Sequence, residues 1–174
     1  YKTAFEDGQR AVRIVRAAAA ERGFDPEKIG VFSMSAGSHL AALLATSSQT
    51  ASYGRIDALD DIPCHINFAC TFAIAYALSD GFGVQNTREG DATDVELDKI
   101  FKFDEKTCAM CRMHAQNDPY SPFSSTRIYR KLREKGVPAE TPVHSVYGPE
   151  GCVGEEQGDE DRQSHQELLP APVE

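Results

Sequence analysis

Apolar residues recur at helical spacing near the start of the chain. Over residues 3–22 they return every three or four positions, which predicts an amphipathic helix. The side chains assigned to its buried face are Val12, Val15 and Ala19, flanked by Ala11, Ile14 and Ala18. The side chains assigned to solvent are Arg10, Arg13 and Arg16. Gly23 is expected to end the helix.

Four short apolar runs follow and predict β-strands. They cover residues 28–33, 66–75, 108–114 and 140–147. Helices are expected over residues 37–45 and 124–135, and a Gly- and Asp-rich loop over residues 79–96. Strands that alternate with helices are typical of the α/β class, with a mostly parallel sheet flanked by helices on both faces.

The character of the chain changes after Gly148. Residues 150–174 carry eight acidic side chains, one arginine and almost no apolar periodicity. This composition predicts a disordered acidic tail. We therefore expect one folded core over residues 1–148 and a tail over residues 149–174.

Composition narrows the classes of partner. The net charge of −9 argues against nucleic-acid binding, because such surfaces need clustered lysine and arginine. No apolar run reaches about 18 residues, and nothing at the start is typical of a signal peptide, so no membrane partner is predicted. The five cysteines are an odd number without the spacing of a disulfide framework, which favours free thiols. This leaves the compartment of a soluble protein open, secreted or cytoplasmic.

The candidate nucleophile lies between the first predicted strand and its helix, in Ser33-Met34-Ser35-Ala36-Gly37. An ester-cleaving serine needs a sharp strand-to-helix turn that lifts its hydroxyl above the sheet and directs the helix N-terminus at the developing oxyanion. Small neighbours, here Ala36 and Gly37, suit such a turn. The pattern is S-x-S-x-G, with Ser33 in place of the usual first glycine. The alternative role for Ser35 is a helix cap.

A candidate acid follows the third predicted strand. Asp118 in His114-Ala115-Gln116-Asn117-Asp118-Pro119 comes after the nucleophile in the chain, which is the order that α/β-hydrolases use. The alternative role is to start a turn before Pro119. His39 and His114 are interpreted as structural, and His65 and His144 show no partner pattern. Cys108 and Cys111 are interpreted as buried free thiols rather than metal ligands, because residues three apart on a strand face opposite ways.

Residues 3–148 resemble the acetylxylan-esterase-like and feruloyl-esterase-like branch of the α/β-hydrolases. The resemblance is carried by Glu6-Asp7-Gly8-Gln9-Arg10-Ala11-Val12, by the elbow continuing into Ser38-His39-Leu40-Ala41-Ala42, and by the run containing Gly136-Val137-Pro138-Ala139-Glu140. It implies a serine esterase that acts on small acyl esters, such as acetyl groups of plant polysaccharide, without a metal or organic cofactor. Ser35 would attack, the Ala36 backbone N–H would bind the oxyanion, and Asp118 would orient a histidine.

The resemblance also places the catalytic histidine in a Gly-Gly-His-Gly-like turn after the last strand. The sequence there contains Cys152 instead, and His165 in the acidic tail is the histidine that follows. His165 is therefore the candidate base. The glycine-rich oxyanion loop that precedes the first helix in the family has no counterpart here, which predicts that the chain is the C-terminal portion of the fold. An exposed sheet edge, and self-association through it, would follow.

Two other functions remain open at this point. A serine peptidase of the prolyl-oligopeptidase type shares the elbow and the acid. A catalytically impaired hydrolase-like module, used for binding or as a scaffold, would account for the histidine missing from its usual turn.

Overall fold

The computed structural model describes residues 2–74, 97–115, 118, 123–141 and 143–144, and these form a parallel β-sheet with helices. The strands are β1 (Gly30–Met34), β2 (Phe68–Phe72), β3 (Ala109–Ala115), β4 (Ala139–Glu140) and β5 (Val143–His144). The sheet order is β1-β2-β3-β4, and β5 also pairs with β3. All pairs are parallel, in agreement with the predicted fold class. The four predicted strands are thus present, with the last one divided into β4 and β5.

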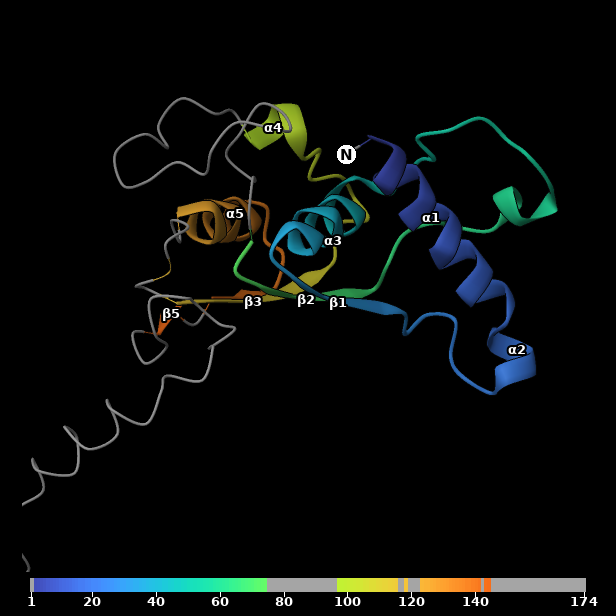
Figure 1. Ribbon diagram of the computed structural model, residues 1–174, viewed down its shortest axis with the longest axis horizontal. Helices are drawn as coiled ribbons and strands as arrows, with labels where there is room; N and C mark the ends of the chain where they lie inside the picture. The colour runs from blue at the N-terminus through green and yellow to red at the C-terminus, as the bar shows by residue number, and fades with distance from the viewer. Residues whose placement is uncertain (1, 75–96, 116–117, 119–122, 142, 145–174) are drawn as a thin grey trace, which may run out of the picture.

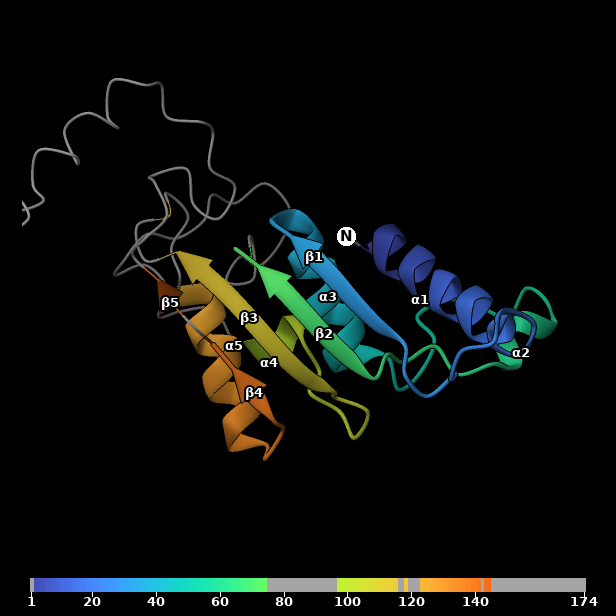
Figure 2. The ribbon, with the colours of Figure 1, turned by 90° about the horizontal axis from the view of Figure 1, so that it is seen from below.

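The helices of the described residues are α1 (Lys2–Ala17), α2 (Ala19–Arg22), α3 (Ala36–Ser47), α4 (Leu97–Ile100) and α5 (Phe123–Glu134), with a 3-10 turn, η1, at Ala58–Asp61. Helices α3, α4 and α5 lie on one side of this sheet, and α1 and α2 lie beyond its β1 edge (Figure 1). In the view from below, the strands lie in front of α3 and α5 (Figure 2). We call the side that carries α3 and α5 the covered face and the opposite side the open face. Helices were expected on both faces of the sheet, and within the part of the chain that the structure describes they cover one face.

The core lies between the covered face and these helices. Ile128 and Leu132 on α5 are fully buried, as are Ala41 and Ala42 on α3. The closely packed alanines allow α3 to approach β1 and β2, which places the turn before α3 beside the end of β2. Among the described helices, none combines the length and the apolar character needed to cross a membrane. The interval 79–96 and the proposed tail over residues 149–174 lie outside the described residues.

The helix predicted over residues 3–22 is divided into α1 and α2 at Ala18. Val12 and Ala19 are buried as predicted, whereas Val15, Arg13 and Arg16 were assigned to the wrong faces. Gly23 ends α2 in the left-handed region at φ 73°. Arg13 and Arg16 are 5% and 7% exposed, whereas Ile14 and Val15 are 50% and 44% exposed. Both arginines bind the connection between α3 and β2: Arg13 donates to the Ile62 carbonyl at 2.8 Å and Arg16 to the His65 carbonyl at 2.8 Å. The guanidinium groups are buried because they satisfy backbone carbonyls that would otherwise lack donors.

Candidate active site

Ser35 lies in a strained turn between β1 and α3. Its backbone has φ 52° and ψ −126°, a positive φ that non-glycine residues rarely adopt. Such a conformation costs roughly 1–3 kcal/mol and persists when the surrounding contacts hold it in place. The residue is exposed, at the edge where β1, β2 and β3 end (Figure 2). The strand, turn and helix predicted around Ser35 are therefore present.

Two hydrogen bonds hold this turn against the end of β2. The Ser35 backbone N–H donates to the Phe72 carbonyl at 2.9 Å, and the buried Ser38 hydroxyl donates to the same carbonyl at 2.8 Å. The Ser33 hydroxyl lies 3.3 Å from the Ser38 hydroxyl, so the residue in place of the usual first glycine faces α3 and fits there. Sequence analysis did not assign Ser38 a role. Its position three residues after Ser35, in the first turn of the helix, could have indicated that it helps to hold the turn.

The N-terminus of α3 provides donors beside Ser35. The helix begins at Ala36, and the first N–H groups of an α-helix have no intrahelical acceptor. The Ala36 N–H thus belongs to the end of the helix that carries partial positive charge, where an oxyanion is stabilised. A Cβ added at Gly37 would come no closer than 3.9 Å to the side-chain atom nearest to it, Ser33 Cβ. Close packing therefore does not explain the glycine at this position.

Asp118 lies just beyond β3, in contact with a buried histidine. The His114 Nε2 atom is 3.5 Å from Asp118 Oδ2, and the two side chains are 0% and 4% exposed. On the other side of the imidazole, Nδ1 lies 2.9 Å from the Ser125 hydroxyl of α5. This chain of contacts connects the carboxylate to the core helix. The contacts agree with the structural role predicted for His114.

Sequence analysis missed the contact of His114 with Asp118 and Ser125. The spacing of residues in the sequence could have indicated this contact. Ser125 shares a helical face with Ile128 and Leu132, which are both fully buried. His114 shares a strand face with Met110 and Arg112, also buried. Two polar residues on two buried faces require partners, and the nearest candidates were each other.

Ser35 and Asp118 lie at the same edge of the sheet, just beyond β1 and β3, and β2 separates these two strands. Neighbouring strands are about 4.8 Å apart, so β1 and β3 are separated by roughly 10 Å. An imidazole that bridges a hydroxyl and a carboxylate through its two ring nitrogens spans a gap of this order. The strand order thus brings Ser35 and Asp118 to one edge of the sheet, two strands apart.

His39 is packed in the core. It is buried on α3, where its ring meets the edge of Phe101 at a centroid distance of 5.5 Å. Burial lowers the pKa of His39 to about 4, so the ring is neutral at pH 7. These contacts agree with its predicted structural role. His165, the candidate base, lies outside the described residues, as does Cys152.

The described residues contain no group of three or more histidine, cysteine, aspartate or glutamate side chains placed to hold a metal ion. The described groups at this edge of the sheet are an exposed hydroxyl beside a helix N-terminus and a buried carboxylate roughly two strands away.

Solved structures with the same arrangement of elements are esterases and related hydrolases. The acetyl ester-xyloside bifunctional hydrolase from Caldicellulosiruptor lactoaceticus superimposes with a TM-score of 0.63 at 22% identity, over 80% of this chain and 54% of that one. The esterase 2 of Thermogutta terrifontis phosphonylated by cyclosarin gives a TM-score of 0.62 at 24% identity, over 94% and 60%. A carbohydrate esterase from gut microbiota gives 0.60 at 17% identity, over 80% and 58%.

The chain spans 54–60% of the length of these three structures, and at these identities the likeness shows the fold. No curated protein matches the chain. The family model BD-FAE matches residues 1–129, which include the Ser35 turn, Asp118, and His114 with its partner Ser125. Since this match covers most of the chain, the protein belongs to the BD-FAE family and has the α/β-hydrolase fold.

Proposed function

We propose that this protein is a carboxylic ester hydrolase that uses Ser35 as its nucleophile. The observation that carries the proposal is the backbone of Ser35, held at φ 52° on a strand-to-helix turn with its side chain exposed. Backbone strain of this kind is retained where surrounding contacts maintain it, and it clusters at active sites. A serine that only capped α3 would accept a hydrogen bond from the helix, and the Ser35 side chain makes no such cap bond.

The proposed reaction follows the acyl-enzyme route. The Ser35 oxygen attacks the ester carbonyl carbon while a histidine takes the hydroxyl proton, and the carbonyl oxygen becomes an oxyanion beside the Ala36 N–H. Collapse of this intermediate breaks the bond to the alcohol, which leaves with the proton from the histidine. Water then attacks the acyl-enzyme by the same route and releases the acid. Asp118 keeps the histidine in the required tautomer.

His165 is the residue we propose as that base. It follows the last strand in the chain, as the family order of nucleophile, acid and histidine requires. Ser35 and Asp118 follow β1 and β3 at one edge of the sheet, two strands apart, and His39 is packed in the core. The described His114 already contacts Asp118 and Ser125 on the covered side.

The proposed substrates are small acyl esters, and acetyl groups on plant polysaccharide in particular. The BD-FAE match and the likeness to an acetyl ester-xyloside hydrolase and a carbohydrate esterase support this class. A structure of the Thermogutta terrifontis esterase 2 has butyrate bound, which supports short acyl groups. An acetylated xylo-oligosaccharide is the natural test substrate.

A fluorophosphonate and p-nitrophenyl acetate test the nucleophile together. The Ser35 oxygen displaces fluoride from phosphorus, so intact mass should rise by one phosphonyl group, and peptide mapping should place it on Ser35. Ser35→Ala should lose the label and reduce p-nitrophenol release on the order of 10³-fold or more. Ser33→Ala, which removes a hydroxyl in the same pentapeptide but on the α3 side, is the matched control and should keep the label.

Equal p-nitrophenol release by the unaltered chain and Ser35→Ala would contradict the esterase mechanism and favour the binding or scaffold module. His165→Ala tests the base separately. Labelling and turnover should both fall, and unchanged values would remove His165 from the mechanism while leaving Ser35 in it.

A further inference from the structure

A buried chain of three side chains connects the proposed acid to helix α5. His114 Nε2 lies 3.5 Å from Asp118 Oδ2, and His114 Nδ1 lies 2.9 Å from the Ser125 hydroxyl. The side chains of His114 and Asp118 are 0% and 4% exposed, and Ser125 is 1% exposed. Polar contacts of this kind are stronger in the interior than in water, because the local dielectric is low. The reaction steps given above use Asp118 alone, and they leave the other two residues without a part.

The two partners of the imidazole decide which of its nitrogens carries the proton. An ionised carboxylate only accepts hydrogen bonds, whereas a hydroxyl can donate or accept. A bare Nε2 would turn its lone pair toward the Asp118 carboxylate, which is unfavourable. In the favoured neutral tautomer the proton is therefore on Nε2, and Nδ1 accepts a hydrogen bond from the Ser125 hydroxyl. The ring thus presents an N–H to the carboxylate.

The Asp118 carboxylate needs contacts that fix its orientation. Rotation about χ2 of aspartate has only broad, roughly twofold preferences. The Asp118 backbone N–H donates to the Ala115 carbonyl at 3.3 Å, but this bond leaves χ2 undetermined. The contact of Oδ2 with Nε2 restricts that rotation and so sets the direction of the second oxygen, Oδ1. At 3.5 Å it is longer than a typical N–H···O bond of about 2.9 Å, so its contribution is mainly electrostatic.

We propose that His114 and Ser125 are positioning residues for Asp118. Ser125 fixes the tautomer and the plane of the imidazole, and the imidazole fixes the carboxylate that orients the catalytic base. This inference rests on the proposed esterase function, in which Asp118 is the acid. Neither residue contacts the substrate in this scheme, so the loss of either should lower kcat and leave KM nearly unchanged.

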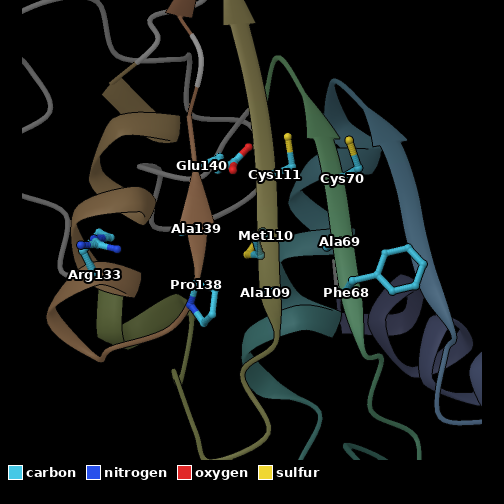
Figure 3. A pocket seen from close by; sticks show the side chains of 10 residues that line it. All are labelled: Phe68, Ala69, Cys70, Ala109, Met110, Cys111, Arg133, Pro138, Ala139 and Glu140. Atoms are coloured by element: carbon cyan, nitrogen blue, oxygen red, sulfur yellow. The ribbon is translucent and has the colours of Figure 1, made fainter.

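Cys111 lies on the same strand but on the other face, and it supplies a control. Residues three apart on a strand point to opposite sides, so Cys111 faces away from α5 when His114 faces toward it. Figure 3 shows its sulfur beside that of Cys70, its register partner on β2. Cys111 is only partly buried, so the expectation that it is a buried thiol is wrong, while that for Cys108 is right. Cys111→Ser therefore alters β3 without removing a contact of Asp118.

NMR of the whole chain with nitrogen-15 in its histidine rings tests the tautomer without any measurement of activity. Slightly above neutral pH, His114 should carry its proton on Nε2, and its signals are assigned by their loss in His114→Gln. Ser125→Ala should shift the Nδ1 resonance, because that nitrogen loses its hydrogen-bond donor. A proton on Nδ1 with a bare Nε2 would overturn the proposal, as would an Nδ1 resonance that Ser125→Ala leaves unchanged.

Steady-state hydrolysis of p-nitrophenyl acetate separates positioning from packing. Ser125→Ala and His114→Leu should each lower kcat by about ten- to a hundredfold, with KM changed by less than about twofold. His114→Gln keeps an N–H near the position of Nε2 and should recover much of this loss. The matched controls are Ser124→Ala, which removes the neighbouring buried hydroxyl of α5, and Cys111→Ser, and both should retain kcat. Far-UV circular dichroism shows which variants are folded, and Ser125→Ala, which lacks a single oxygen atom, carries the test if His114→Leu does not fold.

Failure of this inference and failure of the esterase mechanism give different results. Equal ester hydrolysis by the unaltered chain and Ser35→Ala would remove the mechanism, and the positioning role with it. Full kcat in folded Ser125→Ala, with Ser35 still required, would overturn the positioning role and leave the mechanism in place. An equal loss of kcat in Ser124→Ala and Ser125→Ala, or no recovery in folded His114→Gln, would assign the effect to packing and also contradict the proposal.

Discussion

The two faces of the sheet carry different side chains. Under α3 and α5 the strands place mostly small or polar residues: Val31, Ser33, Ala69, Thr71, Met110, Arg112 and His114. On the open face the same strands place mostly bulky apolar ones: Phe32, Met34, Phe68, Cys70, Phe72, Cys111 and Met113. Phe32 and Phe68 are 68% and 50% exposed.

This difference follows from how each face is packed. The alanines of α3 bring that helix close to β1 and β2, which leaves space only for small side chains between them. The buried Arg112 on the covered face donates one hydrogen bond to the Thr141 hydroxyl and lies 5.5 Å from the Tyr129 ring centroid. Its Nε and Nη1 atoms have no hydrogen-bond partner among the described residues. Apolar residues on both faces are typical of parallel sheets buried on two sides. The open face is thus suited to a covering layer.

The largest expected effect is on the covered face. Ile128→Ala removes a fully buried side chain of α5 from the core and should lower the free energy of unfolding by about 2–5 kcal/mol. Urea denaturation followed by far-UV circular dichroism measures this change. A loss below about 1 kcal/mol would show that α5 is not packed on the sheet as described.

A second test uses the pH dependence of the covered layer. His39 has a pKa of about 4 when folded and an ordinary value near 6.5 when unfolded. Between these values the unfolded chain binds a proton that the folded chain does not, so stability should fall as the pH drops from about 6.5 to 4, by at most about 3 kcal/mol. Stability above pH 6.5 should be unaffected by this group.

His39→Gln should reduce that loss, because glutamine does not titrate. The free energy of unfolding is measured at pH 7 and at pH 4.5 for both proteins, and the change between the two pH values is compared. Carboxylates are common to both proteins, so their contribution to this change cancels. The same pH dependence in both would contradict the burial of the imidazole.

The smallest effect is expected on the open face. Phe32→Ala removes an exposed ring whose main aromatic partner is Phe72, at a centroid distance of 5.0 Å. Such a pair is worth about 0.5–1.5 kcal/mol, so the cost should be near 1 kcal/mol or less. A cost as large as that of Ile128→Ala would show that the open face is covered in solution. Light scattering of the two variants would then identify self-association, which for this protein stays a prediction.

Much of the fold could be predicted because its elements are strongly periodic. The runs that became β1, β2 and β3 were each assigned to the right place, as were α3 and α5. The short elements η1 and α4 were missed, since four residues are too few to show a period. The faces of α1 were misassigned because hydrophobicity alone ranked Val15 above Arg16, whereas the buried arginine is satisfied by carbonyls of a distant connection.

The candidate site also has features that the sequence could predict and features that it could not. The turn at Ser35 was predictable, because a strand, small residues and a helix are contiguous there. Asp118 was singled out because it follows a predicted strand and comes after Ser35 in the chain. Its contact with His114, and the contact of His114 with Ser125, depend on how α5 packs against β3.

The sequence by itself determined the local elements, the parallel class of the sheet and the position of Ser35, since each of these depends on residues close together in the chain. Only the tertiary structure decided that Cys70 and Cys111 are partners, that Arg13 is buried against Asp60, and which face the helices cover. The physical reason is that these contacts join residues about 40 or more positions apart, and their geometry is set by packing and strand register rather than by any period in the sequence.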